Sequence, residues 1–306
     1  GFVLLALFNS ACDQNSSSSA NTQNMAFKSI PVTYPFTRKD TTVRDTYFGK
    51  TIADPYRWLE DDQSEETKDW VKKQNLVTFG YLGQIPYRDK IKQRLEAIWN
   101  FEKFGTPFKK AGKYYFFKND GLQNQSVLYV QDNLESEAKV VLDPNTFSTD
   151  GTSSLQELDF SKDGRYLAYS ISKGGSDWRS IQVKDLQSGQ MLPDVIEWAK
   201  FTGISWAGDG FYYSRYPEPK EGAALTQTNQ NCAIYLHKLG TPQSADQMVY
   251  RDAAHPDRYF GAGTTDDERF LSVTAGESTS GNSLMVRDLV NNPKGLVSIA
   301  EGFDNE

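Results

Sequence analysis

The sequence is poor in several residue types that carry common chemistries. Its 306 residues include only two cysteines, Cys12 and Cys232, and two histidines, His237 and His255. Two cysteines cannot build the disulfide framework of a small secreted domain. No run of 18 apolar residues is present, so the sequence predicts no membrane-spanning helix. The net charge of −7 argues against a nucleic-acid partner, because such a partner requires a basic surface that meets its phosphates.

Motifs of catalysis and of cofactor binding are missing as well. The sequence has no Gly-x-Ser-x-Gly turn to expose a nucleophilic serine, no metal-binding His-Glu-x-x-His or Cys-x-x-Cys, no phosphate-binding loop and no dinucleotide fingerprint. His237 falls within a predicted strand, where we expect a structural role, and His255 precedes a proline in a loop. The acidic pairs at 61–62 and 266–267 lie at predicted turns. We therefore expect no catalytic centre, no metal and no organic cofactor in this chain.

The N-terminus has the composition of an export signal followed by a tether. A short apolar run over residues 2–8 precedes Ser-Ala-Cys, which is similar to a bacterial lipoprotein processing site where Cys12 receives lipid. Asn9 departs from that pattern, because an aliphatic residue is usual there. Residues 13–24 are polar and of low complexity, as flexible tethers are. The leading expectation is a bacterial cell-envelope protein, periplasmic or lipid-anchored through Cys12. Plain secretion, or a cytoplasmic protein that starts at Met25, remains open.

Residues 25–103 predict a helical segment. Ser64 is a candidate N-cap, because two glutamates follow it in the first turn of a helix predicted over residues 64–82. A second helix is predicted over residues 87–99, directly after a proline. Apolar residues recur at helical spacing in both segments, which predicts packing faces rather than a site. These residues are Trp70, Val77 and Tyr81 in the first helix and Ile91, Leu95, Ile98 and Trp99 in the second.

After residue 103 the pattern changes to short apolar and aromatic strands separated by Gly, Asp and Asn turns. One unit of two clear strands recurs four times, at intervals of about 45 to 60 residues. The paired strands are 112–117 and 127–130, 163–169 and 180–183, 209–213 and 233–236, and 267–273 and 283–286. This period and the Asp-Gly turns predict a mainly β fold, a partial β-propeller with about four blades in residues 104–306. Residues 296–301 resemble the start of another unit, so we expect a larger ring that this chain holds in part.

Several motifs, in their order along the chain, resemble those of the prolyl oligopeptidase family. The longest is Asp-Pro-Tyr-Arg-Trp-Leu-Glu-Asp at residues 54–61. The likeness runs from about residue 34 to the end, and it is closer to prolyl oligopeptidase proper than to oligopeptidase B. The further motifs lie at residues 121–125, 127–132, 142–145, 150–152, 160–166, 175–178 and 192–195.

The resemblance implies a serine peptidase that cleaves short peptides on the carboxyl side of proline. In that family the helical segment packs on a C-terminal α/β-hydrolase domain, and a seven-bladed propeller caps the active site. The catalytic Ser, Asp and His belong to the hydrolase domain, which would follow residue 306, so no catalytic residue is assigned here. The implied partners are proline-containing peptides and that hydrolase domain.

The resemblance also implies site residues in the propeller. Phe201 and Phe260 fall where an aromatic or apolar side chain helps to line the proline-side pockets. A third apolar position falls near Glu277, where this sequence departs from the family. Asp177 falls at a position that faces the hydrolase domain and that an arginine from that domain could pair with. The alternatives are plain packing for each phenylalanine and a turn hydrogen bond for Asp177.

Two functions are therefore open. The leading one is the N-terminal part of an exported prolyl oligopeptidase, whose propeller screens substrates by size. The other is a stand-alone propeller that binds a partner without catalysis. The helical segment and its motif at residues 54–58 disfavour the second function, because a free propeller does not need them.

Overall fold

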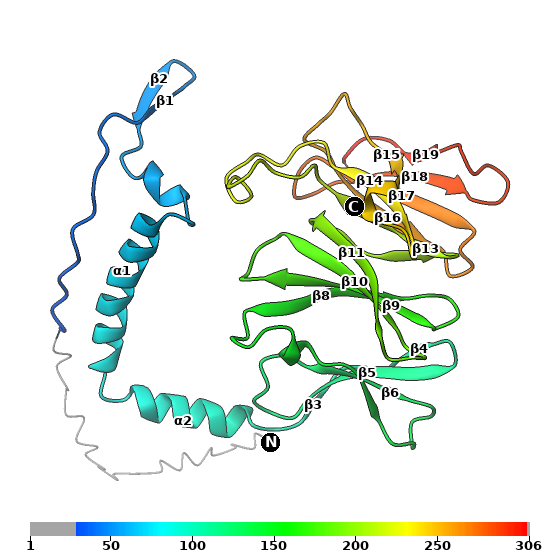
Figure 1. Cartoon of the computed structure of the whole chain (residues 1–306), viewed down its shortest axis with the longest axis horizontal. Helices are drawn as coiled ribbons and strands as arrows, with labels where there is room; N and C mark the ends of the chain where they lie inside the picture. Colours follow the sequence, from blue (N-terminus) through cyan, green and yellow to red (C-terminus); the bar gives the residue numbers. More distant parts are fainter. Residues whose placement is uncertain (1–28, 305–306) are drawn as a thin grey trace, which may run out of the picture.

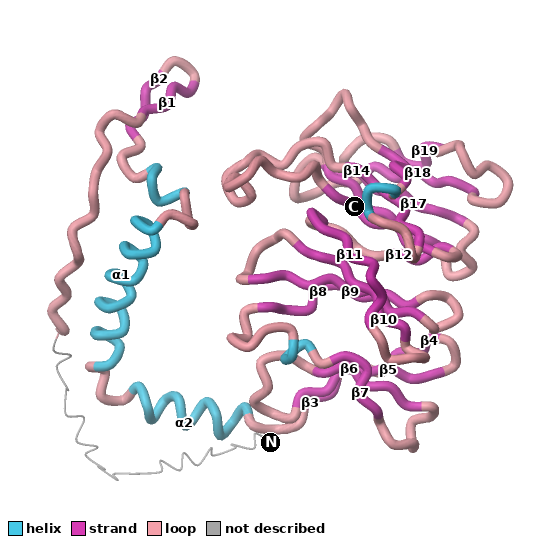
Figure 2. The backbone as a smooth tube through the Cα atoms, viewed as in Figure 1, coloured by secondary structure: helices cyan, strands magenta, loops and turns pink. Residues whose placement is uncertain are grey.

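The computed structural model describes residues 29–304, which form a helical arm and a set of curled antiparallel sheets (Figures 1 and 2). The arm contains two α-helices, α1 (Glu65–Gly83) and α2 (Arg88–Trp99). Both agree with the predicted ranges to within one residue at each end. Ser64 caps α1 as predicted, because its hydroxyl accepts a hydrogen bond of 3.2 Å from the backbone N–H of Thr67.

The arm begins with a hairpin that the sequence did not predict, formed by β1 (Arg44–Tyr47) and β2 (Lys50–Ala53). Its two-residue turn holds Phe48 and Gly49 at positive φ angles of 49° and 78°. Such a turn normally carries Asn, Asp or Gly at both positions. Because Phe48 occupies the first position, the local sequence does not predict the hairpin. The 3-10 helix η1 (Arg57–Glu60) follows and leads into α1.

The sheets form four blades, each a four-stranded antiparallel meander. This arrangement confirms the predicted partial β-propeller. Blade 1 also carries the short strand β3 (Lys103–Phe104) beside its first strand. The blades are β4 (Phe108–Lys110), β5 (Lys113–Asn119), β6 (Val127–Gln131) and β7 (Lys139–Leu142); β8 (Ser153–Phe160), β9 (Tyr166–Lys173), β10 (Arg179–Asp185) and β11 (Met191–Ala199); β12 (Ser205–Ala207), β13 (Gly210–Arg215), β14 (Ala233–Lys238) and β15 (Gln247–Tyr250); and β16 (Tyr259–Thr264), β17 (Phe270–Gly276), β18 (Ser283–Asp288) and β19 (Val297–Ala300).

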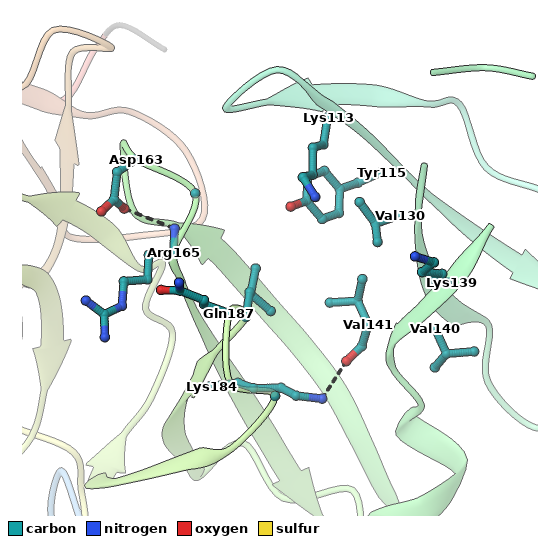
Figure 3. A pocket seen from close by; sticks show the side chains of 13 residues that line it. Lys113, Tyr115, Val130, Lys139, Val140, Val141, Asp163, Arg165, Lys184 and Gln187 are labelled. Carbon is teal, nitrogen blue, oxygen red and sulfur yellow. Dashed lines mark hydrogen bonds between the residues drawn. The ribbon is translucent and has the colours of Figure 1, made fainter. Parts of the chain in front are cut away.

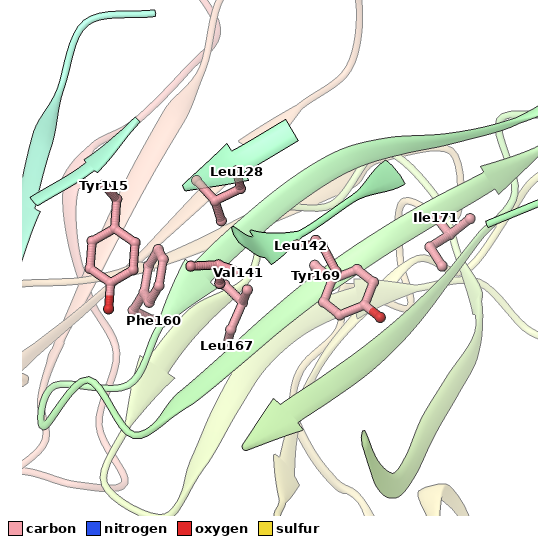
Figure 4. Packing of buried hydrophobic residues seen from close by; sticks show 8 residues of the cluster. All are labelled: Tyr115, Leu128, Val141, Leu142, Phe160, Leu167, Tyr169 and Ile171. Carbon is pink, nitrogen blue, oxygen red and sulfur yellow. The ribbon is translucent and has the colours of Figure 1, made fainter. Parts of the chain in front are cut away.

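The hydrophobic core lies between neighbouring blades rather than within one of them. The first of three clusters joins Leu128 and Val141 of blade 1 to Phe160 and Leu167 of blade 2 (Figure 4). Leu128 and Leu167 are both completely buried. Two similar clusters join blade 2 to blade 3 and blade 3 to blade 4. Each blade therefore buries apolar side chains of the next blade.

The connections between strands alternate between two ends of the blades, because consecutive strands run in opposite directions. The tight turns between the first and second strands lie at one end, which we call the turn end. The longer connections at 174–178, 200–204, 216–232 and 277–282 lie at the other, which we call the loop end. Figure 1 shows the helical arm on the loop-end side of the blades, with the long 216–232 connection extending toward α1.

Candidate functional site

The loop end brings together two of the residues singled out from the sequence, Asp177 and Phe201. A buried lysine, Lys200, links them. Its Nζ lies 3.8 Å from Asp177 Oδ2, 4.8 Å from the ring centre of Trp178 and 5.3 Å from that of Phe201. The Lys200 side chain is 10% exposed, whereas that of Asp177 is 61% exposed. We call these four residues the loop-end site.

Phe201 combines two features that packing does not explain. Its side chain is 53% exposed, and its φ angle of 51° lies in the left-handed region. A bulky residue rarely adopts that conformation, and such strain is found where the surrounding structure holds a residue for a function. An exposed aromatic ring on a strained backbone is typical of a residue presented to a ligand or to another domain.

Trp178 forms the aromatic floor of the loop-end site. Its indole N–H donates a hydrogen bond of 2.7 Å to the backbone carbonyl of Ala224, which ties the 174–178 loop to the 216–232 connection. The ring also packs edge-to-face against Trp198 at 5.5 Å and against Tyr216 at 6.3 Å. A cavity of 540 Å³ lies beside this floor, between Trp178, Tyr216 and the 217–231 stretch. The site is thus a rigid platform next to a groove.

Phe260 is placed differently. It lies near the start of β16, is 2% exposed and belongs to the core between blades 3 and 4. Its ring meets Tyr250 edge-to-face at 5.1 Å. This placement supports the packing role that was left open from the sequence, and the ring offers no surface to a peptide.

Glu277 takes part in an ion-pair network instead of an apolar contact. Arg258 donates from Nε to Glu277 at 2.7 Å and from a terminal nitrogen to Asp252 at 2.8 Å. His255 also bonds to Asp252, at 2.8 Å. The hydrogen bond from His255 and that from Arg258 hold the pKa of Asp252 below its usual range. The departure from the family at Glu277 therefore coincides with a charged contact at the loop end.

The described residues hold no assembled catalytic centre. The ring nitrogens of His237 and His255 bond to carboxylates, and no serine hydroxyl is among their partners in residues 29–304. The same residues contain no cluster of His, Cys, Asp and Glu suited to a metal ion. None of the described helices is long and apolar enough to cross a bilayer. Cys12, the candidate lipidation site, lies outside the described residues.

A cavity of 610 Å³ lies at the turn end between blades 1 and 2, at the opposite end of the blades from the loop-end site; Figure 3 shows the residues that line it. Its walls combine apolar side chains with several cations, two of which already have partners within the fold. Lys184 donates to the carbonyl of Val141 at 2.7 Å, and Arg165 pairs with Asp185 at 3.1 Å. The Lys184 contact crosses from blade 2 to blade 1, so this cavity lies in the junction between the two blades.

Sequence reasoning missed Lys200 and Trp178, which hold the site together. Trp178 belongs to the motif at 175–178, and Lys200 directly precedes Phe201, so both lie next to residues that the sequence did single out. A lysine after a strand usually points to solvent, and nothing in the local sequence indicates that this one is buried against two rings. That role is seen only in the folded chain, where the 200–204 connection lies against the 174–178 connection.

The fold is a partial β-propeller with a helical arm. Comparison with known proteins shows the family to which the chain belongs. Residues 35–306 match the family described as "Prolyl oligopeptidase, N-terminal beta-propeller domain". The chain belongs to the prolyl oligopeptidase family, as the resemblance in its motifs indicated.

Individual relatives agree with this assignment. The chain is 50% identical to a prolyl endopeptidase of Elizabethkingia meningoseptica over 273 residues, which cover 89% of this chain and 38% of the relative. It is 36% identical to prolyl oligopeptidase A of Amanita bisporigera, covering 90% of this chain and 41% of that protein. A solved structure of prolyl oligopeptidase B from Galerina marginata, bound to a 25mer macrocyclization substrate, superposes with a TM-score of 0.74 at 30% identity, over 88% of this chain and 42% of that one. The chain thus spans about two fifths of the length of these relatives.

Proposed function

We propose that this chain is the N-terminal part of a prolyl endopeptidase, a serine peptidase that hydrolyses short peptides on the carboxyl side of proline. The observation that carries the proposal is the 50% identity to a prolyl endopeptidase over 89% of the chain. In this proposal the catalytic triad belongs to a hydrolase domain encoded after residue 306. The propeller caps that domain and screens peptides by size.

The exposed apolar face of the arm supports a partner domain of this kind. On α2 the side chains of Ile91, Leu95, Ile98 and Trp99 are between 47% and 62% exposed, although they share one face of the helix. On α1, Leu76 and Phe79 are also exposed. Contiguous apolar surface of this sort is typical of an interaction face. We assign it to contact with the hydrolase domain.

The loop-end site has a separate role in the proposal. Phe201 supplies an apolar surface beside the proline of the substrate, where burial of its ring favours binding. The Asp177 side chain is exposed, so its carboxylate can accept a hydrogen bond from an arginine of the hydrolase domain. Lys200 positions both residues, because its ammonium group lies against the Phe201 ring and near the Asp177 carboxylate. No step of bond cleavage is assigned to this chain.

The chemistry would follow the general logic of serine hydrolysis in the partner domain. A histidine takes the proton of the serine nucleophile, an aspartate orients that histidine, and backbone donors stabilise the oxyanion. This chain contributes the cap, the groove beside Trp178 and the apolar contact from Phe201. Its own contribution is therefore to selectivity and access.

The test compares the 306-residue chain with the whole gene product on a Gly-Pro amide substrate. The whole product should hydrolyse the amide and lose activity to a serine-directed phosphonate. The 306-residue chain should be inactive, because its described residues hold no serine hydroxyl bonded to a histidine. Turnover by the purified 306-residue chain, abolished by replacing one of its own serines, would refute the proposal.

For localisation we propose that Cys12 carries lipid and that residues 13–24 tether the enzyme to a bacterial membrane. Several acyl chains hold a lipoprotein firmly, whereas a single chain binds only marginally. Cys12→Ser should release the protein into the soluble fraction or block its processing. Unchanged membrane association in that variant would leave only plain export or a cytoplasmic start at Met25.

A further inference from the structure

A buried histidine joins blade 2 to blade 3. His237 on β14 is 0% exposed and lies between two carboxylates whose side chains are also buried, Asp194 at 1% and Asp246 at 0%. Its Nε2 lies 3.0 Å from Asp194 Oδ1, and its Nδ1 lies 2.7 Å from Asp246 Oδ1. Asp194 belongs to β11 in blade 2, and Asp246 follows the 3-10 helix η3 (Gln243–Ala245) in blade 3. We call this group, together with Tyr213, the His237 clamp.

The geometry constrains the protons of the clamp. A neutral imidazole has one N–H donor and one nitrogen acceptor, and an ionised carboxylate only accepts. Two carboxylates can bond to both ring nitrogens without a clash of acceptors only if both nitrogens carry protons, or if one carboxyl group is itself protonated. The clamp therefore holds either an imidazolium cation or a carboxylic acid.

The other groups around the clamp favour the imidazolium. Asp194 Oδ1 also accepts the backbone N–H of Gly240 at 2.6 Å, and an ionised oxygen accepts from two donors better than a hydroxyl oxygen does. The Tyr213 hydroxyl donates to Asp246 Oδ2 at 2.6 Å, which leaves Asp246 Oδ1 to accept from the ring. Burial lowers the pKa of His237, but the hydrogen bonds to Asp246 and Asp194 outweigh it and raise the pKa above its ordinary value.

The clamp lies where the sheet itself joins the two blades weakly. The backbone ladder between β11 and β13 consists of one residue pair, Ala199 with Arg215. Further along β11, the Gln243 side chain bonds to both backbone groups of Glu197, at 3.0 and 2.9 Å. Beyond that one pair, side chains join the two blades here, and the His237 clamp contains the only salt bridge between blades 2 and 3 in the described residues.

We propose that His237 is kept as a doubly protonated imidazolium that fastens blade 2 to blade 3, so that this joint weakens in alkaline solution. The groups that face the ring are Asp194 from β11, Asp246 after η3 and, behind Asp246, Tyr213 from β13. The ring of Phe211 on β13 covers it at 5.2 Å between centres and carries no charge. A histidine whose pKa is higher in the folded state stabilises that state fully below about pH 6.5, the usual value of the unfolded chain. This contribution is lost as the pH rises through the folded-state pKa.

The first test measures the melting temperature of the whole gene product against pH, for the parent and for His237→Gln. The difference in melting temperature should be largest near pH 6 and should narrow by several degrees toward pH 10, because the variant has no proton to lose. The matched control is His255→Gln, which removes the exposed histidine, with a side chain that is 53% exposed. Its melting temperature should still fall toward pH 10 as that of the parent does, because His237 is intact. A difference that stays constant across the range would overturn the proposal.

A second measurement does not depend on whether His237→Gln folds. Nitrogen-15 spectra of the histidine-labelled parent should show a ring with both nitrogens protonated at pH 7.5, where an ordinary histidine is mostly neutral. Asp194→Asn, which keeps the shape and removes one charge, should shift the titration of that ring to lower pH. A His237 ring with a single protonated nitrogen at pH 7.5 would contradict the proposal. Neither measurement uses peptidase activity, so their outcome is independent of the proposed function.

Discussion

The arm and the blades are both rich in regularly spaced apolar residues, but they bury them very differently. In the blades, Leu128 and Leu167 are 0% exposed. In the arm, Leu95 is 54% exposed and Trp99 is 62% exposed. The blades cover one another through the clusters between them, whereas the described residues leave the apolar face of the arm exposed. Spacing therefore predicts which face of an element is apolar, and it does not predict what covers that face.

The largest expected effect comes from matched leucine truncations in the two regions. Leu167→Ala should destabilise the 306-residue chain by about 2–5 kcal/mol, because it leaves a cavity between blades 1 and 2. Leu95→Ala should change the stability of the same chain by less than about 0.5 kcal/mol, since an exposed side chain loses little. Urea unfolding of both variants measures the two values. Equal costs would mean that the arm is already packed in this chain.

A smaller effect is expected at the loop-end site. Phe201→Ala in the whole gene product should remove apolar contact worth about 1–3 kcal/mol, which is roughly a tenfold to hundredfold loss in kcat/KM. The loss should be larger for peptides with a bulky group at the contacted subsite than for truncated ones. The melting temperature should not fall, because the ring is exposed and its backbone is strained. If the variant unfolds, or loses no activity on any peptide, Phe201 is a packing residue.

The cap of α1 tests the local stability of the arm. Ser64→Ala removes the hydroxyl that accepts from the Thr67 N–H and should cost about 1 kcal/mol of helix stability. Ser64→Asp is the matched control and should retain the cap. Amide exchange over residues 65–70 measures the effect. Faster exchange in the alanine variant alone is expected, and equal exchange in both variants would show that packing rather than the cap fixes the start of the helix.

The smallest effect is expected for Lys200→Met, which keeps most of the stem and removes the charge. The loss of its contacts with Asp177 and with two rings should lower kcat/KM about twofold to fivefold, because Lys200 acts on the substrate only through those residues. Lys200→Arg should restore part of the loss. A pure packing role would instead show as a lower melting temperature with unchanged kinetics.

The sequence predicted the helices and the repeating pairs of strands, because hydrophobic period and turn residues are local signals. It did not predict the first and fourth strands of the blades, with one exception at residues 296–301. These residues were predicted to start another unit, but they form β19, the fourth strand of blade 4, because they pair with β18. The strand β11, for example, contains Pro193 and two acidic residues, and it is a strand because β10 pairs with it. Phe201 and Asp177 were identified through the family resemblance, while Lys200 required the meeting of two loops. The burial of Phe260 and of the His237 clamp depends on the neighbouring blade, which no local pattern shows.

The measurement that tests the central claim most directly is amide hydrogen exchange of α1 and α2 in the 306-residue chain and in the whole gene product. The account predicts fast exchange of residues 88–99 in the chain alone and strong protection in the whole product, where the hydrolase domain covers Leu95 and Trp99. The blade core around Leu167 should be protected equally in both and serves as the internal control. Equal exchange of α2 in the two proteins, with the blade core intact, would contradict the claim that the arm is the docking face of a catalytic domain.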